Sequence, residues 1–322
     1  MHDIIIIGGG PTGINCAIEA QKAGFDYVIL EKGVLVNSIF NFPANMTFFS
    51  TSLKLEIGDT PFISHSDKPT RREALEYYRR LLEKFDLNIK FGAEVMGMSK
   101  SDGHYIVDAG EKTYESKYVI IATGFYDHPN MMDVPGEDLP KVKHYYDEVH
   151  HYIRKKVLVV GGANSACDVA LECWQKGADV TMAVRGESLY KNVKYWILPN
   201  IENRIKEESI KAYFNTTIKE IKPKSVILKT PEGEIEIEND FVLAMTGYSP
   251  NYTLLSNLGI EIKEDKLKTP VFDEHSLETN LPGVFMAGVV GGGLKTNRYF
   301  IENTRHHAQQ ITREIELRES IA

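Results

Sequence analysis

Residues 3–13 read DIIIIGGGPTG, and this stretch decides the fold. The isoleucines at 4–7 predict a strand that is buried on both faces, because they form an unbroken β-branched apolar run. Gly8, Gly10 and Gly13 follow at once and match the pattern G-x-G-x-x-G. Glycines at this spacing permit a tight turn and a close approach of the backbone to a pyrophosphate, which lies at the N-terminus of the next helix.

The residues that follow complete the pattern of a dinucleotide-binding unit. Apolar residues at helical spacing extend from Ile14 to a stop at Gly24, and a second strand at 27–30 ends in Glu31. An acid at this place accepts hydrogen bonds from an adenosine ribose. A glycine-rich turn alone can be purely structural. Here strand, glycines, helix, strand and acid occur in order, so the sequence predicts dinucleotide binding.

The overall composition limits the possible functions. A chain of 322 residues suits two domains, and a formal net charge of −8 argues against nucleic acid as a partner. No apolar run approaches the roughly 20 residues of a membrane span, and no secretory leader is recognisable. The three cysteines, Cys16, Cys167 and Cys173, form no C-x-x-C and no metal-ligand spacing, so we expect no metal and reduced thiols in a cytoplasm.

The same pattern occurs a second time. Residues 157–160 are a predicted strand, GGANSA at 161–166 is a degenerate phosphate turn, and the strand at 180–184 ends in Arg185. Arginine at this position suits the 2′-phosphate of NADP, although a solvated strand end is the ordinary alternative. The residues predicted to bind NADPH are Gly161, Gly162, Asn164, Ser165, Arg185 and Lys191.

Two Thr-Gly turns, ATG at 122–124 and MTG at 245–247, predict where the chain crosses between domains. One unit ends in an acid and the other in an arginine, which favours FAD in the first and NADPH in the second. The expected fold class is α/β, with two Rossmann-like dinucleotide-binding domains, the second inserted in the first. The expected boundaries are 1–125 and 248–322 for the FAD-binding domain and 126–247 for the NADPH-binding domain.

Other parts of the first domain are expected to complete the flavin site. The aromatic, loop-like residues 32–69 could cover a bound ring system, and GVFMAG at 283–288 predicts a strand with small residues beside a ligand. A final helix is expected to start near 296–303 and to run to the end. The residues predicted to bind FAD are Gly8, Gly10, Pro11, Thr12, Gly13, Glu31, Lys32, Asn45, Met46, Val95, Thr123, Gly124, Gly288 and Thr296.

The whole chain resembles the flavoproteins of low-molecular-weight thioredoxin-reductase type, through the paired glycine turns, the Thr-Gly crossings and the GVFMAG segment. More closely, it resembles the bacillithiol disulfide reductases. That likeness rests on NMTFFST at 45–51, GDTPF at 58–62, KPTR at 68–71, YWILP at 195–199 and FIEN at 300–303. The resemblance implies an NADPH-dependent FAD enzyme, expected to be a homo-oligomer, that reduces a small disulfide such as bacillithiol disulfide.

Three features of the sequence depart from the families that the chain resembles. Residues 125–160 contain no cysteine, which argues against a thioredoxin reductase. Thr12, expected beside the flavin, stands where the bacillithiol branch has a cysteine, and Val289 stands where the wider superfamily has an aspartate for the FAD ribityl chain. Cys16 is the only thiol near the flavin turn and is expected to flank the core. Either reduced flavin attacks a bound disulfide directly, or the acceptor is not a disulfide.

The expected activity is hydride transfer from NADPH to the flavin, with no side chain assigned as acid or base. The histidines at 150, 151, 306 and 307 are expected to lie on surfaces or helix faces. A ferredoxin– or flavodoxin–NADP reductase is an alternative, but its usual C-terminal aromatic is missing after Phe300. A flavin monooxygenase is another alternative, but it would need its own fingerprint after the first domain, and this sequence does not supply it. A redox sensor that binds both nucleotides without turnover is the alternative from another class.

Overall fold

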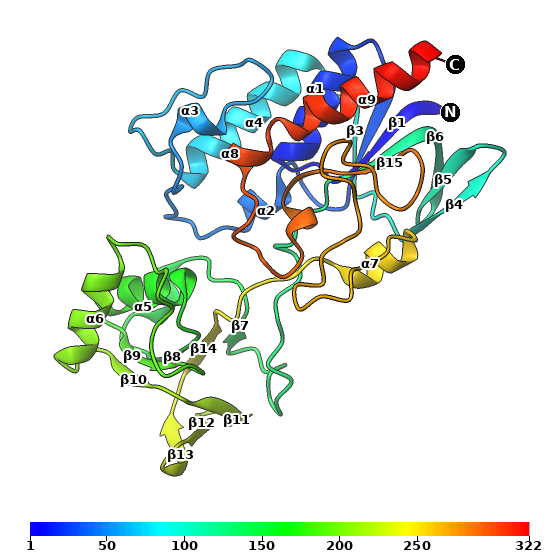
Figure 1. Ribbon diagram of the computed structural model, residues 1–322. Coiled ribbons are helices and arrows are strands. Elements are labelled where there is room, and N and C mark those ends of the chain that lie inside the picture. The colour runs from blue at the N-terminus through cyan, green and yellow to red at the C-terminus, as the bar shows by residue number, and fades with distance from the viewer. Residues whose placement is uncertain (322) are drawn as a thin grey trace. The chain divides into compact units, whose positions relative to one another are not determined.

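The computed structural model describes residues 1–321 (Figure 1). The chain forms two compact units. The first comprises residues 1–41, 45–128 and those from 248 onward, and the second comprises residues 42–44 and 129–247. The chain therefore leaves the first unit after His128 and re-enters it at Tyr248, close to the two Thr-Gly turns.

A largely parallel sheet forms the centre of the first unit. Its strand order is β3-β2-β1-β6-β5-β4, and β15 also pairs with β6. β1 pairs in parallel with β2 on one side and with β6 on the other, with Ile7 opposite Leu30 and Ile121. The strands are β1 (His2–Ile7), β2 (Tyr27–Glu31), β3 (Ile89–Phe91), β4 (Gly97–Ser101), β5 (His104–Ala109), β6 (Lys112–Ile121) and β15 (Val284–Met286).

Helices cover the central strands, which explains the unbroken apolar sequence of β1. Ile4, Ile5 and Ile6 have no exposed surface. α1 and α9 lie side by side along this sheet (Figure 1). The helices of this unit are α1 (Pro11–Lys22), α2 (Asn37–Phe40), α3 (Ser52–Leu55), α4 (Arg71–Phe85), α7 (Tyr252–Asn257), α8 (Ile301–Thr304), α9 (His307–Ile321) and the 3₁₀ helix η2 (Gly288–Gly292).

Two local features of this unit follow directly from the sequence. Thr70 caps α4 through the backbone N–H of Glu73, and the Glu73 carboxylate accepts the Thr70 N–H, so the two residues form a capping box. β4 and β5 form a hairpin, with Ser101 paired to His104. Both turn residues between them have positive φ, which suits a tight hairpin turn.

The second unit repeats the parallel arrangement. One sheet has the order β10-β9-β8-β14-β7, and a separate antiparallel sheet has the order β11-β12-β13. The strands are β7 (Val142–Lys143), β8 (Lys156–Val160), β9 (Asp179–Ala183), β10 (Lys211–Tyr213), β11 (Thr217–Ile221), β12 (Ser225–Thr230), β13 (Gly233–Glu238) and β14 (Phe241–Ala244). The helices are the 3₁₀ helix η1 (Val149–Tyr152), α5 (Asn164–Gln175) and α6 (Leu198–Lys206).

Two cores cover the two faces of the parallel sheet in this unit. Val157 and Val159 of β8 pack with α5 on one face, whereas Leu158 packs with Val226 and Leu228 of β12 on the other. Successive side chains of β8 thus pack alternately into two apolar cores. The predicted α/β fold with two Rossmann-like units is confirmed.

The final helix differs from expectation. One continuous helix was expected from 296–303 onward, but α8 ends at Thr304 and α9 begins at His307. His307 is the first residue of α9 and is buried, so of its two expected places the helix face is found and the surface is wrong. The ring is 5% exposed. No helix within residues 1–321 is both long and apolar enough to cross a membrane.

Candidate functional site: two dinucleotide turns

The three pattern glycines of the first turn have different physical reasons to be glycine. Gly8 has φ +110°, and a Cβ there would lie 2.6 Å from the Ala122 carbonyl oxygen. A Cβ on Gly13 would lie 1.9 Å from the Gly8 carbonyl oxygen, so α1 can approach β1 only at a glycine. Gly10 has an ordinary φ of −78°, and a Cβ there would meet no atom within 4 Å. The open space beside Gly10 is where a pyrophosphate can approach the backbone.

Glu31, at the end of β2, is tied to the same turn. One carboxylate oxygen accepts the Gly9 N–H at 2.7 Å, and the other accepts the Gly33 N–H at 2.8 Å. Burial raises the pKa of this carboxyl above its usual value, although these two N–H groups act in the opposite direction. Each carboxylate oxygen has a second lone pair, so Glu31 can accept ribose hydroxyls while it holds the turn.

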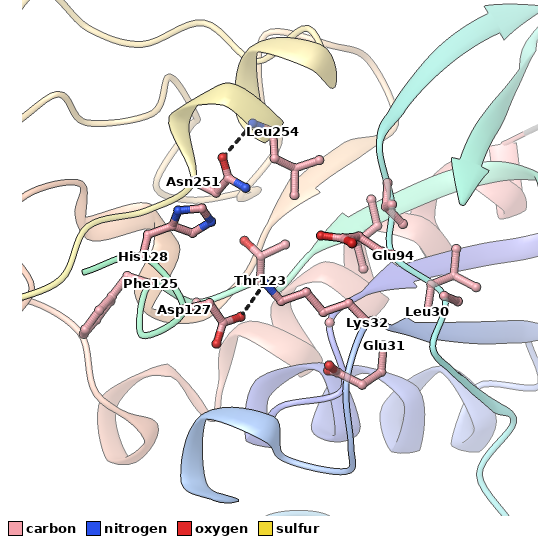
Figure 2. Close-up of a pocket in the computed structure, with 15 residues that line it drawn as sticks. Leu30, Glu31, Lys32, Glu94, Thr123, Phe125, Asp127, His128, Asn251 and Leu254 are labelled. Atoms are coloured by element: carbon pink, nitrogen blue, oxygen red, sulfur yellow. Dashed lines mark hydrogen bonds and ion pairs between the residues drawn. The ribbon is translucent and has the colours of Figure 1, made fainter. Parts of the chain in front are cut away.

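A pocket opens at the carboxyl ends of β1, β2 and β6 (Figure 2). The chain leaves β1 toward β2 on one side and reaches β6 on the other, so this is the topological switch point where open α/β sheets bind ligands. The pocket is lined by Ile7, Gly8, Leu30, Glu31, Lys32, Ala93, Glu94, Val95, Thr123, Gly124, Phe125, Asp127, His128, Asn251 and Leu254. Of the residues predicted to bind FAD, it brings together Gly8, Glu31, Lys32, Val95, Thr123 and Gly124.

Besides the predicted Lys32, three titratable side chains that no sequence pattern indicated line this pocket: Glu94, Asp127 and His128. Lys32 reaches Asp127, and Nζ lies 3.1 Å from Oδ2 (Figure 2). Burial, followed by the charge of Lys32, lowers the pKa of His128. Glu94 lies on the segment after β3. Asp127 and His128 fall within the range expected for the NADPH-binding domain, 126–247, but they belong to the first unit, where they reach the end of β2.

The other eight residues predicted to bind FAD do not line this pocket: Gly10, Pro11, Thr12, Gly13, Asn45, Met46, Gly288 and Thr296. Three of them, Asn45, Met46 and Thr296, lie on loop segments. The Met46 carbonyl accepts the Arg71 N–H at 2.9 Å, Asn45 is exposed, and Thr296 is half-buried in the segment before α8. Their contact with a cofactor stays a prediction. Pro11 is the first residue of α1, where its missing N–H and fixed φ suit a helix start.

A second group of residues adjoins the N-terminus of α1. Gly288 has φ +82°, and a Cβ there would lie 2.7 Å from Thr12 Oγ1, so the Gly288 backbone packs closely against the Thr12 side chain. The Gly288 N–H donates to Nδ1 of His307 at 3.1 Å. Burial, followed by the neighbouring His306, lowers the pKa of His307 to about 4, which keeps the imidazole neutral at pH 7.

The cysteines are poor nucleophiles. Cys16 is 1% exposed, and burial followed by the charge of Glu19 raises its pKa to about 12. Burial likewise raises the pKa of Cys167 and of Cys173 to about 12, and all three thiols are free. The thiolate is the reactive form, so none of them is activated. Within residues 1–321 no group of acids, histidines and cysteines is arranged to hold a metal ion.

The phosphate turn of the second unit has the same construction as the first. Gly161 has φ +131°, and a Cβ there would lie 2.5 Å from the Met245 carbonyl oxygen. A Cβ on Gly162 would lie 2.7 Å from Val184. Asn164 begins α5, and its Oδ1 accepts the Lys194 N–H at 2.9 Å, which ties the loop after β9 to the turn.

The basic residues predicted to bind NADPH are exposed. Arg185 follows β9, and Lys191 lies on the next loop. Among residues 1–321 neither side chain has an ion-pair or hydrogen-bond partner, so both charges are available to a ligand. Ser165 is exposed on the first turn of α5. An exposed guanidinium beside a phosphate turn can bind a phosphate bidentately.

Two parallel sheets with glycine turns, one followed by a buried acid and one by an exposed arginine, define the class of oxidoreductases that bind two dinucleotides. The family model described as pyridine nucleotide-disulphide oxidoreductase matches residues 5–288, and the chain belongs to this family. It is therefore an oxidoreductase that uses FAD and NADPH, as the sequence predicts.

Known proteins resemble the chain along nearly its whole length. It is 45% identical over 318 residues to bacilliredoxin reductase Bdr of Bacillus subtilis strain 168, covering 98% of each chain. The structure matches bacillithiol disulfide reductase Bdr from Staphylococcus aureus with a TM-score of 0.94, at 39% identity and 98% coverage of each chain. It matches the Bacillus cereus enzyme with a TM-score of 0.95, at 41% identity, covering 98% of this chain and 99% of that one.

The buried His307 leads to a prediction about acid stability. In the unfolded chain this imidazole takes up a proton near pH 6.5, but in the folded protein only near pH 4. The contribution of His307 to the free energy of unfolding is complete above pH 6.5. It falls by about 3 kcal/mol as the pH drops to 4. Thermal unfolding of the cofactor-free protein across this range should therefore fall less steeply in His307→Asn. Parallel curves for the two proteins would contradict this expectation.

Proposed function

We propose that the protein reduces bacillithiol disulfide with NADPH, so that NADPH, a proton and one disulfide give NADP⁺ and two thiols. The observation that carries this proposal is the likeness to bacillithiol disulfide reductases over 98% of the chain, at 39% and 41% identity. The proposal is supported by two complete glycine turns, the first followed by Glu31 and the second by Arg185. A protein that bound a single nucleotide would not require both turns.

In this proposal each unit holds one cofactor. The backbone around Gly10 and the carboxylate of Glu31 hold the adenosine diphosphate half of FAD. Gly161, Gly162 and Arg185 hold NADPH, with Arg185 on the 2′-phosphate. When bound, the nicotinamide supplies a hydride and the flavin passes the two electrons on. The chain itself binds and orients both groups.

The three thiols take no part in this proposal. With a pKa of about 12, Cys16 is a thiolate in only about one molecule in 10⁵ at neutral pH. Thr12 occupies the place beside Gly288 and carries a hydroxyl, which cannot form a disulfide. The bound disulfide is therefore reduced without a protein thiol relay.

Replacing Cys16 tests this point. We expect Cys16→Ser to retain NADPH-driven disulfide reduction within about a factor of three of wild type, because a buried protonated thiol contributes packing and not electrons. Steady-state NADPH oxidation measures this, and anaerobic flavin reduction by NADPH is the control. Lost turnover with normal flavin reduction would identify Cys16 as the working thiol.

An electron-transfer role toward ferredoxin or flavodoxin is less favoured, because the near-full-length relatives at 39–45% identity are named as reductases of bacilliredoxin or of bacillithiol disulfide. Steady NADPH consumption with a small acceptor would also exclude a sensor without turnover. The free, buried cysteines suit a reducing cytoplasm. Assembly into a homo-oligomer remains a prediction, which sedimentation of the FAD-loaded protein would test.

A further inference from the structure

His307 connects three segments of the first unit. Its Nδ1 accepts the Gly288 N–H at 3.1 Å, which places the proton of the neutral ring on Nε2. Within residues 1–321 Nε2 has no hydrogen-bond acceptor, but this atom is not fully buried. The imidazole of this largely buried residue therefore uses one nitrogen to hold the Gly288 turn and leaves the other accessible to solvent or to a ligand.

The turn that His307 holds meets the phosphate turn. The position of a Gly288 Cβ lies 2.7 Å from Thr12 Oγ1, and Thr12 is the second residue of α1. Asn15, also buried on α1, donates from Nδ2 to the Arg305 carbonyl at 2.5 Å and fixes the segment just before His307. The N-termini of α1, η2 and α9 therefore meet at one buried junction beside the dinucleotide turn.

Within residues 1–321 no other polar side chain bonds to the backbone of Gly288. Val289, the next residue, directs a methyl group toward Gly124, 3.9 Å from that glycine's Cβ position. Ala287 is held only through its backbone, by the Ile121 carbonyl at 2.9 Å. Apart from backbone hydrogen bonds, the imidazole of His307 is what holds this turn.

We propose that His307 is a positioning residue for the bound flavin: it fixes the Gly288 turn against Thr12 and presents Nε2–H within the same junction. The proposal rests on the placement of FAD at Gly8–Gly13. It predicts that the position of the acceptor atom matters, and not simply the polarity or the size of the side chain.

Three substitutions of His307 test the proposal. The amide oxygen of His307→Asn branches from the same carbon position as Nδ1 and can accept the Gly288 N–H. In His307→Gln the oxygen is one bond further out, and His307→Leu has no acceptor. His306→Asn, at the exposed neighbour, is the matched control. The measurements are FAD titration of the cofactor-free protein by flavin fluorescence, the visible spectrum and the reduction potential.

We expect His307→Leu and His307→Gln to bind FAD about tenfold or more weakly and to shift the flavin spectrum and potential. The affinity of His307→Asn for FAD should stay within about threefold of that of wild type. If Asn and Gln behave alike, or if Leu lowers only the melting temperature and leaves FAD affinity and spectrum unchanged, His307 is purely structural. The comparison of Asn with Gln decides the question even if Leu does not fold. Failure of FAD to bind wild type would instead refute the placement of FAD.

Discussion

Gly10→Ala is expected to give a folded protein that has lost most of its affinity for FAD. A Cβ at this position meets no atom within 4 Å, and φ is −78°, so the fold accepts alanine. The methyl group would instead fill the space through which a pyrophosphate approaches the backbone. Losing one or two charge-assisted hydrogen bonds corresponds to a weakening of about 10- to 100-fold.

The neighbouring glycine supplies the contrast. A Cβ on Gly9 would lie 2.9 Å from Ile89 and 3.0 Å from Glu31, so Gly9→Ala should lower the melting temperature of the cofactor-free protein. Gly10→Ala should leave that temperature within a few degrees of wild type. Flavin fluorescence titration and thermal unfolding of both variants measure the two effects. Unchanged FAD affinity in Gly10→Ala would remove the first turn from the cofactor site.

Arg185→Ala is expected to reduce the preference for NADPH over NADH by about tenfold or more. The exposed guanidinium has no partner within residues 1–321, and a hydrogen bond to a charged group contributes roughly 1.5–3 kcal/mol. The rate of anaerobic flavin reduction by each nucleotide measures the preference. The rate with NADH should barely change, since NADH lacks the 2′-phosphate.

A matched control for this prediction is Lys176, at the C-terminal end of α5 in the same unit. Lys176 is exposed and follows α5, whose N-terminus carries the phosphate turn. Lys176→Ala removes one positive charge from the same unit, so it reports any long-range effect of net charge. If both variants lose the same selectivity, or if wild type reduces equally fast with both nucleotides, Arg185 does not read the 2′-phosphate.

The local patterns of the chain were sufficient to predict the fold and both turns. Strand, glycines and helix follow one another within residues 3–22, so neighbouring residues determine the geometry around Gly8, Gly10 and Gly13. The end of β2 likewise brings Glu31 to the turn. These contacts are set by strand register and by how closely two backbones can approach. Both are predicted from apolar periodicity and glycine spacing.

The rest of the site depends on contacts between distant segments. Asp127 faces Lys32 only because a linker-like segment returns to β2, and no local pattern indicates that return. His307 is buried at the break where α8 ends at Thr304 and α9 begins at His307, and helical periodicity does not predict this break. Asn164, predicted as a ligand, uses its oxygen to hold the Lys194 N–H. Such long-range partners cannot be found by helical or strand periodicity.

The most direct test of the proposed function is NADPH oxidation by the FAD-loaded protein with bacillithiol disulfide as acceptor. Wild type is compared with a variant in which Cys16, Cys167 and Cys173 are all serine. The account predicts disulfide-dependent turnover in both, with two thiols released for each NADPH consumed, and little turnover with NADH. A wild-type protein whose flavin is reduced by NADPH but is not reoxidised by the disulfide would contradict it.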